Sequence, residues 1–441
     1  MSIQSIMIKE RVWLMRLKPK IIKTGFIYLW LAGATAFASP DFSMIGYAAV
    51  SGDSVTKTTG GAGGDTVKIS TLSALQSWAD SREKNTTPEV VLIQGKISSD
   101  TTVTITIKNG ANISIVGQGT TGELEHVGLN IRDYSNVIVR YLTIHEVLYP
   151  DDALTLDDVR HGWVDHCELY SKIGVGITMD TYDGLLDIKK GSCYITISWC
   201  HLHDHMKCSL IGHTDNANQR EEDGQITVTY HHNWFNRTSG RNPSLRFGAV
   251  HMFNNYYDSI FDYGLAARDS AHAKVENCHY NRVRLPMATN KFQDTSSSNY
   301  DKYPGFICES GNIFTDSCGA DSILQSGCDY WTSQTLPYSY DLDEVSTVEA
   351  TVKAYTGTGK TTTGTISQVS QQTAATHVNK QLSIKTAVQL SSGRNIDGAE
   401  VYSVNGSRLN AAGIFQTNRI QGVFIVKSPV KTVKPKFRSW K

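Results

Sequence analysis

The stretch Ile226-Thr-Val-Thr-Tyr-His-His-Asn-Trp-Phe235 carries the pattern that decides the fold. It is a short run of β-branched and aromatic residues, typical of a strand, with an asparagine close behind it. Similar runs recur about every 22 to 32 residues, beginning at Ile113, Val137, Trp163, Tyr194, Ala249 and Ala271. A period of this length indicates a solenoid, in which each coil packs only on its neighbours.

A second repeat runs in step with the strands. Asn233, Asn254 and Asn277 each follow a strand at a similar offset, so we expect their amides to stack as a ladder inside the solenoid. Cys167 and Cys200 take the equivalent place in the two preceding coils, either as stacked thiols or as a disulfide. The alternative fold, a β-sandwich, calls for two-residue hairpins at spacings of about 8 to 12 residues, and such hairpins are scarce here.

The N-terminal segment has the features of an export signal. Six basic residues between Lys9 and Lys23 precede an apolar run from Gly25 to Ala38, which ends in the small-x-small pattern Ala36-Phe-Ala38. A membrane anchor is the alternative, but the run is shorter than the ~20 residues that a spanning helix needs. We therefore predict a signal peptide over residues 1–39 and a secreted protein without a stable membrane span.

The composition of the chain after residue 39 indicates three segments. Residues 40–345 hold the predicted solenoid, residues 346–379 are rich in Thr, Ser and Gly and read as a linker, and residues 380–441 read as a small β module. In the module, strands are predicted at 401–404 and 422–426, the first ending in the hairpin signal Asn405-Gly406.

The 42 basic and 42 acidic residues balance, so no global charge favours nucleic acid.

Eight cysteines in an exported chain permit disulfides but do not fix their pairing. They lie at positions 167, 193, 200, 208, 278, 308, 318 and 328. No two of them have the C-x-x-C spacing that is common in structural zinc sites. Disulfide pairing therefore stays open at this point.

Charged residues concentrate between Asp183 and Arg246 in a way that suggests chemistry on an acidic polymer. Asp183 and Asp187 are carboxylates able to hold a hard cation. Downstream, Lys207, Arg241 and Arg246 offer positive charge to an anionic substrate. The chain thus combines a candidate metal site with a local basic patch.

Four motifs in order resemble the pectate lyase family of right-handed, single-stranded parallel β-helix enzymes. They are Thr59-Gly-Gly-Ala-Gly-Gly64, Trp163-Val-Asp-His166, Asp183-Gly-Leu-Leu-Asp-Ile-Lys189 and Arg241-Asn-Pro-Ser-Leu-Arg246. The resemblance covers nearly all of residues 45–340. It implies an all-β fold and calcium-dependent β-elimination of polygalacturonate, which leaves a 4,5-unsaturated sugar. Since a capped solenoid is usually monomeric, we expect a monomer.

The same resemblance implies roles for individual residues. Asp152, Asp183 and Asp187 match the calcium ligands, and Arg241 matches the base that removes the C5 proton. Matches to substrate-binding residues are Lys207, Arg246, Arg268 and Lys189. Because guanidinium groups normally stay protonated, a base of this kind predicts an alkaline pH optimum. Asp165 and His166 are interpreted as an internal hydrogen-bonded pair.

Several alternatives remain. His201, His203 and His205 alternate and would share one face of a strand, where zinc could bind, although the resemblance assigns no metal to them. A pectin lyase acting on methylated chains, or a non-catalytic β-helix that binds polysaccharide, could share the fold. The C-terminal module resembles bacterial sorting domains, and a carbohydrate-binding module is its alternative.

Overall fold

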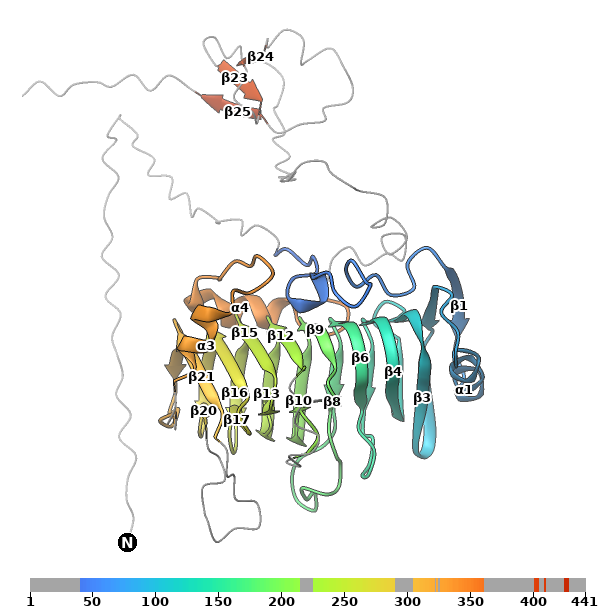
Figure 1. The fold of residues 1–441 in the computed structure, drawn as a ribbon. Coiled ribbons are helices and arrows are strands. Elements are labelled where there is room, and N and C mark those ends of the chain that lie inside the picture. Colours follow the sequence, from blue (N-terminus) through green and yellow to red (C-terminus); the bar gives the residue numbers. More distant parts are fainter. Residues whose placement is uncertain are drawn as a thin grey trace, which may run out of the picture. The chain divides into compact units, whose positions relative to one another are not determined.

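The computed structural model describes residues 40–214, 225–289, 304–321, 323 and 326–360, together with three short strands near the C-terminus. From Asp65 onward the chain coils into a right-handed parallel β-helix whose strands lie side by side along the molecule (Figure 1). The predicted solenoid is therefore confirmed. The predicted signal peptide, residues 1–39, lies outside the described residues.

Three parallel sheets form the sides of each coil. The first consists of β1 (Asp65–Ile69), β2 (Glu89–Ile93), the last parts of β3 (Lys96–Gly117), β4 (Glu123–Arg140) and β6 (Leu154–Asp165), and then β9 (Cys193–Ser198), β12 (Thr227–His231), β15 (Ala249–Phe253), β18 (His272–Glu276) and β21 (Phe306–Ser310).

The second sheet consists of the first parts of β3 and β4, followed by β5 (Thr143–His145), β7 (Glu168–Tyr170), β10 (His201–Lys207), β13 (Trp234–Gly240), β16 (Tyr256–Ile260), β19 (His279–Val283) and β22 (Ile313–Thr315). The third consists of the middle of β3 and β4, the first part of β6, and then β8 (Leu186–Lys189), β11 (Leu210–Ile211), β14 (Ser244–Arg246), β17 (Leu265–Arg268) and β20 (Met287–Ala288).

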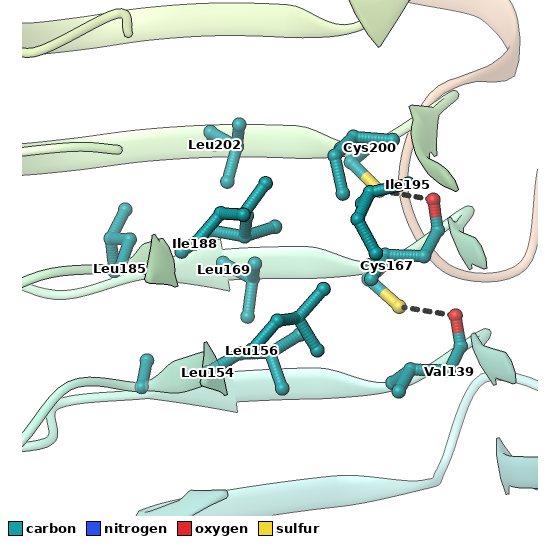
Figure 2. Close-up of a cluster of buried hydrophobic side chains, with 14 of the residues drawn as sticks. Val139, Leu154, Leu156, Cys167, Leu169, Leu185, Ile188, Ile195, Cys200 and Leu202 are labelled. Atoms are coloured by element: carbon teal, nitrogen blue, oxygen red, sulfur yellow. Dashed lines mark hydrogen bonds between the residues drawn. The ribbon is translucent and has the colours of Figure 1, made fainter. Parts of the chain in front are cut away.

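One continuous apolar core fills the space between the three sheets. Since side chains alternate along a strand, every second residue of each sheet points inward. Figure 2 shows Leu154, Leu156, Leu169, Ile188 and Leu202 from successive coils in this core, all of them fully buried. The remaining residues of the same strands face outward and are free to carry function.

Short helices complete the described fold. They are η1 (Tyr47–Ala49), α1 (Leu72–Ser81), α3 (Cys328–Ser333) and α4 (Val345–Tyr355). The Thr71 side chain caps α1 by accepting a bond from the amide of Ala74. Leu75 and Trp78 of α1 join the core, so this helix covers the open end of the first coil. None of the described helices is long and apolar enough to cross a bilayer.

The asparagine ladder exists, but its predicted register is wrong at two positions. Asn233 is fully buried and donates its amide Nδ2–H to Asn255 Oδ1 at 3.0 Å, so Asn255 and not Asn254 is the next step. Asn254 and Asn277 have positive φ and form the corner between the first and second sheets. Asn and Asp tolerate this conformation better than most residues, which explains why an asparagine also stands there.

Cysteines occupy the same ladder in the neighbouring coils. Cys167 and Cys200 are free, buried thiols, and Figure 2 shows them one coil apart in the core. Cys167 donates to Val139 O at 3.5 Å and Cys200 donates to Ser198 O at 3.3 Å. The alternative of stacked thiols is therefore correct for this pair. The one disulfide among the described residues joins Cys308 and Cys328, and it ties α3 to β21.

A buried charge network confirms the interpretation of Asp165 and His166. Asp165 is fully buried; its Oδ2 accepts bonds from His166 Nδ1 and Arg140 Nη2 at 2.7 Å each, and its Oδ1 accepts one from Ser198 Oγ. The Arg140 guanidinium also packs over the Trp163 ring at 4.3 Å. The network joins three successive coils at the end of the first sheet.

The predicted linker is wrong over its first part. Residues 345–355 form α4, in which Val348 and Val352 are buried against Tyr256. Two valines at i, i+4 share one helix face, and this signal was hidden by the surrounding Thr and Ser residues. Residues 361–379 lie outside the described residues. In the C-terminal module, β23 (Glu400–Ser403) pairs antiparallel with β24 (Arg408–Leu409) and β25 (Phe424–Lys427), which confirms its strands.

Candidate active site

A row of charged side chains lies on the outer face of the third sheet. The strand pairing aligns Ile188 with Ile211 and Leu245 with Ala267, all of them buried, so the residues on either side of each point outward. Asp187 and Lys189 flank Ile188 on β8. By the same alternation, Arg246 on β14 and Arg268 on β17 follow Leu245 and Ala267 and are direct neighbours.

Asp152 and Asp187 converge on one lysine. Lys189 Nζ lies 2.6 Å from Asp152 Oδ2 and 3.4 Å from Asp187 Oδ2, while the two carboxylates are only 7% and 3% exposed. Burial and the nearby Asp152 raise the pKa of Asp187 to about 7. Burial also acts to raise the pKa of Asp152, but Lys189 outweighs it and holds that pKa below its usual value. The two carboxylates therefore carry more negative charge than Lys189 balances. A further cation nearby would stabilise their ionised forms.

Gly184 gives these carboxylates room. A Cβ atom at this position would lie 2.4 Å from Asp187 Oδ1 and 2.8 Å from Asp152 Oδ1. Instead, the Gly184 amide donates to Asp152 Oδ1 at 2.8 Å, and Thr155 Oγ1 donates to Asp152 Oδ2 at 2.8 Å. The Leu210 amide fixes Asp187 by donating to its Oδ1 at 3.1 Å. Both carboxylates are thus held in place before any ligand arrives.

Asp183 faces a different cation. Lys207 Nζ, at the end of β10, donates to Asp183 Oδ1 and to Asp180 Oδ1 at 3.0 Å each. Its ammonium group lies 5.7 Å from the centre of the Tyr149 ring, which is more than half exposed. Asp183 is adjacent to Gly184 in the chain. The predicted metal-binding carboxylates and the predicted substrate-binding lysine therefore lie in the same region.

His205 anchors Asp183 through the backbone. Its ring is buried and its Nε2–H donates to the Asp183 carbonyl at 2.6 Å, while burial lowers the pKa of His205 to about 4. The expectation that His205 shares a face with His201 and His203 is wrong. Asp204 lies between them with a φ of 49°, and this left-handed residue interrupts the alternation of the strand.

A rigid turn presents Arg241. It follows β13 and has a φ of 61°, which places it at the corner between the second and third sheets. The next residue, Asn242, is fully buried; it accepts a bond from Thr238 Oγ1 at 2.7 Å and donates to Tyr263 O at 2.8 Å. Arg241 is close enough to Asp187 to favour the ionised form of that carboxyl. The turn therefore brings a guanidinium near Asp187.

The two remaining arginines extend the positive row. Arg246 Nη1 donates to the Gly212 carbonyl at 3.0 Å, and its Nε lies 3.8 Å from Asp269 Oδ2. Arg268 is 4% exposed and pairs in register with Arg246. Neighbouring parallel strands lie about 4.8 Å apart, so these cations repeat at short intervals across the sheet. Such a row suits a chain of regularly spaced anions.

The structure brings the predicted residues into one region but does not make the three aspartates a single tight cluster. Asp152 and Asp187 share Lys189, whereas the Asp183 carboxylate is held by Lys207. Sequence reasoning missed the supporting residues Gly184, His205 and Asn242. A signal existed for two of them, since Gly184 lies inside the Asp183–Asp187 motif and Asn242 inside the Arg241–Arg246 motif.

Comparison with known proteins identifies the family of this chain. Residues 17–361 match the family model described as pectate lyase. The chain is 38% identical over 324 residues to a pectate trisaccharide-lyase of Bacillus licheniformis, which covers 73% of this chain and 87% of that protein. It is 36% identical over 270 residues to probable pectate lyase A of Neosartorya fischeri, covering 61% of this chain and 76% of that one.

Solved structures of pectate lyases are also similar to this chain. A pectate lyase from Bacillus sp. N165, crystallised with trigalacturonate, superposes with a TM-score of 0.60 at 32% identity and covers 72% of this chain and 99% of its own. A pectate lyase from Paenibacillus sp. 0602 shares the fold, with a TM-score of 0.58 at 20% identity, covering 73% and 97%. The chain thus belongs to the pectate lyase family, and the protein is a polysaccharide lyase.

Proposed function

We propose that this enzyme cleaves α-1,4-linked polygalacturonate by calcium-dependent β-elimination. The observation that carries the proposal is the buried pair of Asp152 and Asp187, which shares Lys189 and lies near Arg241, together with Arg246 and Arg268 on neighbouring strands. A carboxylate pair suits a hard cation, and the basic row suits a polymer with one carboxylate on each sugar.

The donor set fits calcium. Asp152, Asp183 and Asp187 supply carboxylate oxygens, the ligands that calcium prefers, and the raised pKa of Asp187 reflects a buried pair that a further cation would relieve. Because Gly184 has no Cβ, both Oδ1 atoms can lie close to the main chain there. When bound, calcium would draw charge from the substrate carboxylate and so make the neighbouring C5 proton more acidic.

The charged side chains of the site then have separate roles in the reaction. Lys207, Arg246, Arg268 and Lys189 bind the carboxylates of the polymer and hold one C5–H bond next to Arg241. Arg241, in its neutral form, removes the C5 proton, and the electron pair left on C5 forms the C4–C5 double bond as the C4–O bond breaks. The leaving oxygen takes up a proton from solvent while the protonated Arg241 returns one to it, so no water is consumed overall. A guanidinium must first lose a proton, and the rate should therefore rise toward alkaline pH.

The calcium assignment is tested by removing and restoring the ion. Activity on polygalacturonate should vanish after treatment with a chelator, return with calcium, and stay absent with zinc or magnesium alone. An Asp187→Asn variant should need far more calcium than the wild type for half-maximal rate. Full activity in excess chelator would remove calcium from the mechanism and favour a pectin lyase acting on methylated chains.

A Gly184→Ala substitution should weaken calcium binding without unfolding the protein. The added methyl group would lie 2.4 Å from Asp187 Oδ1 and so must push that carboxylate out of place. We expect a loss of at least about tenfold in calcium affinity, as is typical when the support of a metal ligand is disturbed. Calorimetric titration with calcium measures it. Thermal unfolding of the variant in calcium-free buffer, with a Tm close to that of the wild type, serves as the control for the fold.

We further propose that the enzyme acts outside the cell. The support is the basic, then apolar N-terminal segment that ends at Ala36-Phe-Ala38, together with a polymeric substrate too large to be imported intact. The C-terminal module is proposed as a secretion or sorting domain. Deleting residues 380–441 should abolish export and leave activity unchanged, whereas weaker polymer binding would favour a carbohydrate-binding module.

A further inference from the structure

Three potential metal ligands meet on the outer face of the second sheet, away from the carboxylate pair. Glu168 lies on β7, and His201 and His203 lie two positions apart on the neighbouring strand β10. Glu168 and His201 are partners in register, while the intervening Leu169 and Leu202 point into the core. The three side chains therefore project outward together from two adjacent strands, with ligand atoms within 4.8 Å of one another.

His203 Nε2 and Glu168 Oε1 form one long hydrogen bond, and the separations among these polar atoms also suit a metal ion. His201 Nδ1 lies 3.5 Å and His203 Nε2 lies 3.3 Å from the same Glu168 oxygen, Oε1. Charge-assisted hydrogen bonds are usually about 2.7–2.9 Å long. A tetrahedral zinc ion with bonds of about 2.0–2.1 Å keeps its ligand atoms about 3.3 Å apart. The two nitrogen-to-oxygen distances already match this spacing, and the stacked His201 and His203 rings, whose centres are 4.1 Å apart, would turn to complete it.

A second layer of contacts orients His203. Its Nδ1–H donates to Asp204 Oδ2 at 2.7 Å, which directs Nε2 toward Glu168. Asp204 is fixed in turn by Arg237, whose Nε donates to Asp204 Oδ1 at 2.7 Å. A carboxylate behind a ligating imidazole is the usual support of histidine at zinc sites. Stacking holds the rings as well, with His201 on Trp234 at 4.2 Å and His203 on Tyr170 at 4.7 Å.

A neighbouring cluster of potential ligands is less suited to a metal ion. Glu125, His145 and Glu146 also lie close together on the same sheet. There, however, Lys96 Nζ lies 2.8 Å from Glu125 Oε2, and Lys172 pairs with Glu146, so lysines already neutralise the carboxylates. In the part of the chain that the structure describes, the ion pairs of Glu168 are with the two imidazoles alone. Its side chain is 31% exposed, so an ion can reach it.

We propose that Glu168, His201 and His203 bind one divalent transition-metal ion such as zinc, at a site separate from the proposed calcium site. Imidazole nitrogen suits zinc, cobalt and nickel, whereas calcium prefers oxygen ligands. Water completes the coordination. The other Glu168 oxygen, Oε2, accepts a bond from Thr358 Oγ1 at 3.3 Å, and the Gly357 amide donates to Trp199 O, so the ion would also secure the segment after α4.

Calorimetric titration of the purified protein with zinc tests the proposal, without substrate and with calcium in excess. One zinc ion should bind per chain. Binding should be lost in His201→Ala and His203→Ala and unchanged in the control His272→Ala, which alters a histidine of the first sheet. Asp204→Asn, which removes only the support of His203, should weaken binding about 10- to 100-fold. Zinc should also raise the Tm of the wild type but not of His203→Ala.

Three results would overturn the proposal. One is the absence of zinc binding to the wild-type protein at micromolar concentrations. Another is undiminished binding in both His201→Ala and His203→Ala, with thermal unfolding in zinc-free buffer showing that each variant is folded. The third is loss of binding in His145→Ala alone, which would place the ion in the neighbouring cluster. None of these measurements depends on lyase activity, so the two proposals fail independently.

Discussion

The Arg241→Lys variant should cleave polygalacturonate about 10² to 10⁴ times more slowly than the wild type, because this is the usual contribution of a positioned general base. Lysine keeps a positive charge, but its single ammonium group cannot reproduce the position and geometry of the guanidinium. The surrounding turn should persist, since it is held by the Asn242 side chain rather than by Arg241. The decrease should therefore appear in kcat, with little change in KM.

A matched substitution separates this effect from a general loss of arginine. Arg284 is an exposed residue paired with Asp262 at 2.9 Å, and Arg284→Lys should leave the rate unchanged. Initial rates measured from the ultraviolet absorbance of unsaturated ends provide the comparison. A turnover of Arg241→Lys within about threefold of the wild type would exclude Arg241 as the base.

Replacing Asp165 by asparagine should destabilise the β-helix by about 3–5 kcal/mol, because Arg140 would remain buried without its partner. The network also contains His166 and Ser198, so one substitution disturbs bonds in three coils. The free energy of unfolding in urea measures the loss. Asp316→Asn, at an exposed partner of Arg282, should cost less than about 1 kcal/mol. Equal costs for the two variants would contradict the role given to the network.

The same carboxyl predicts the response to acid. Burial tends to raise the pKa of Asp165, but His166 and Arg140 outweigh burial and lower it from 3.8 to about 2. A carboxyl whose pKa is lowered on folding stabilises the protein above its unfolded pKa, and this contribution disappears as the pH falls. The wild type should therefore lose stability between about pH 4 and pH 2. Urea unfolding over this range should show a weaker pH dependence in Asp165→Asn.

The fold could be predicted from the sequence because a solenoid repeats its signal. Each coil contributes a strand such as Ile226–Thr229 at a similar spacing, so many weak signals add up. The ladder register could not be fixed in the same way. Asn254 and Asn255 are adjacent, and the sequence does not tell which one points inward and which one adopts the left-handed corner conformation. The helix α4 was missed because only Val348 and Val352 mark its buried face.

The candidate site was predicted as residue types at family spacing, and the structure brings those residues into one region. What the sequence could not supply is which cation meets which carboxylate. Lys189 lies with Asp152 and Asp187, whereas Lys207 lies with Asp183, and both pairings depend on the path of the residues between β7 and β8. The same holds for Glu168, which is far from His201 in the chain and meets it only through strand pairing.

The most direct test of the proposed chemistry is the product formed from polygalacturonate by the purified protein at alkaline pH in the presence of calcium. β-Elimination predicts a rise in ultraviolet absorbance from 4,5-unsaturated ends, equal in amount to the new reducing ends, which chelator stops and added calcium restores. New reducing ends without that absorbance would mean hydrolysis and would contradict the proposed mechanism.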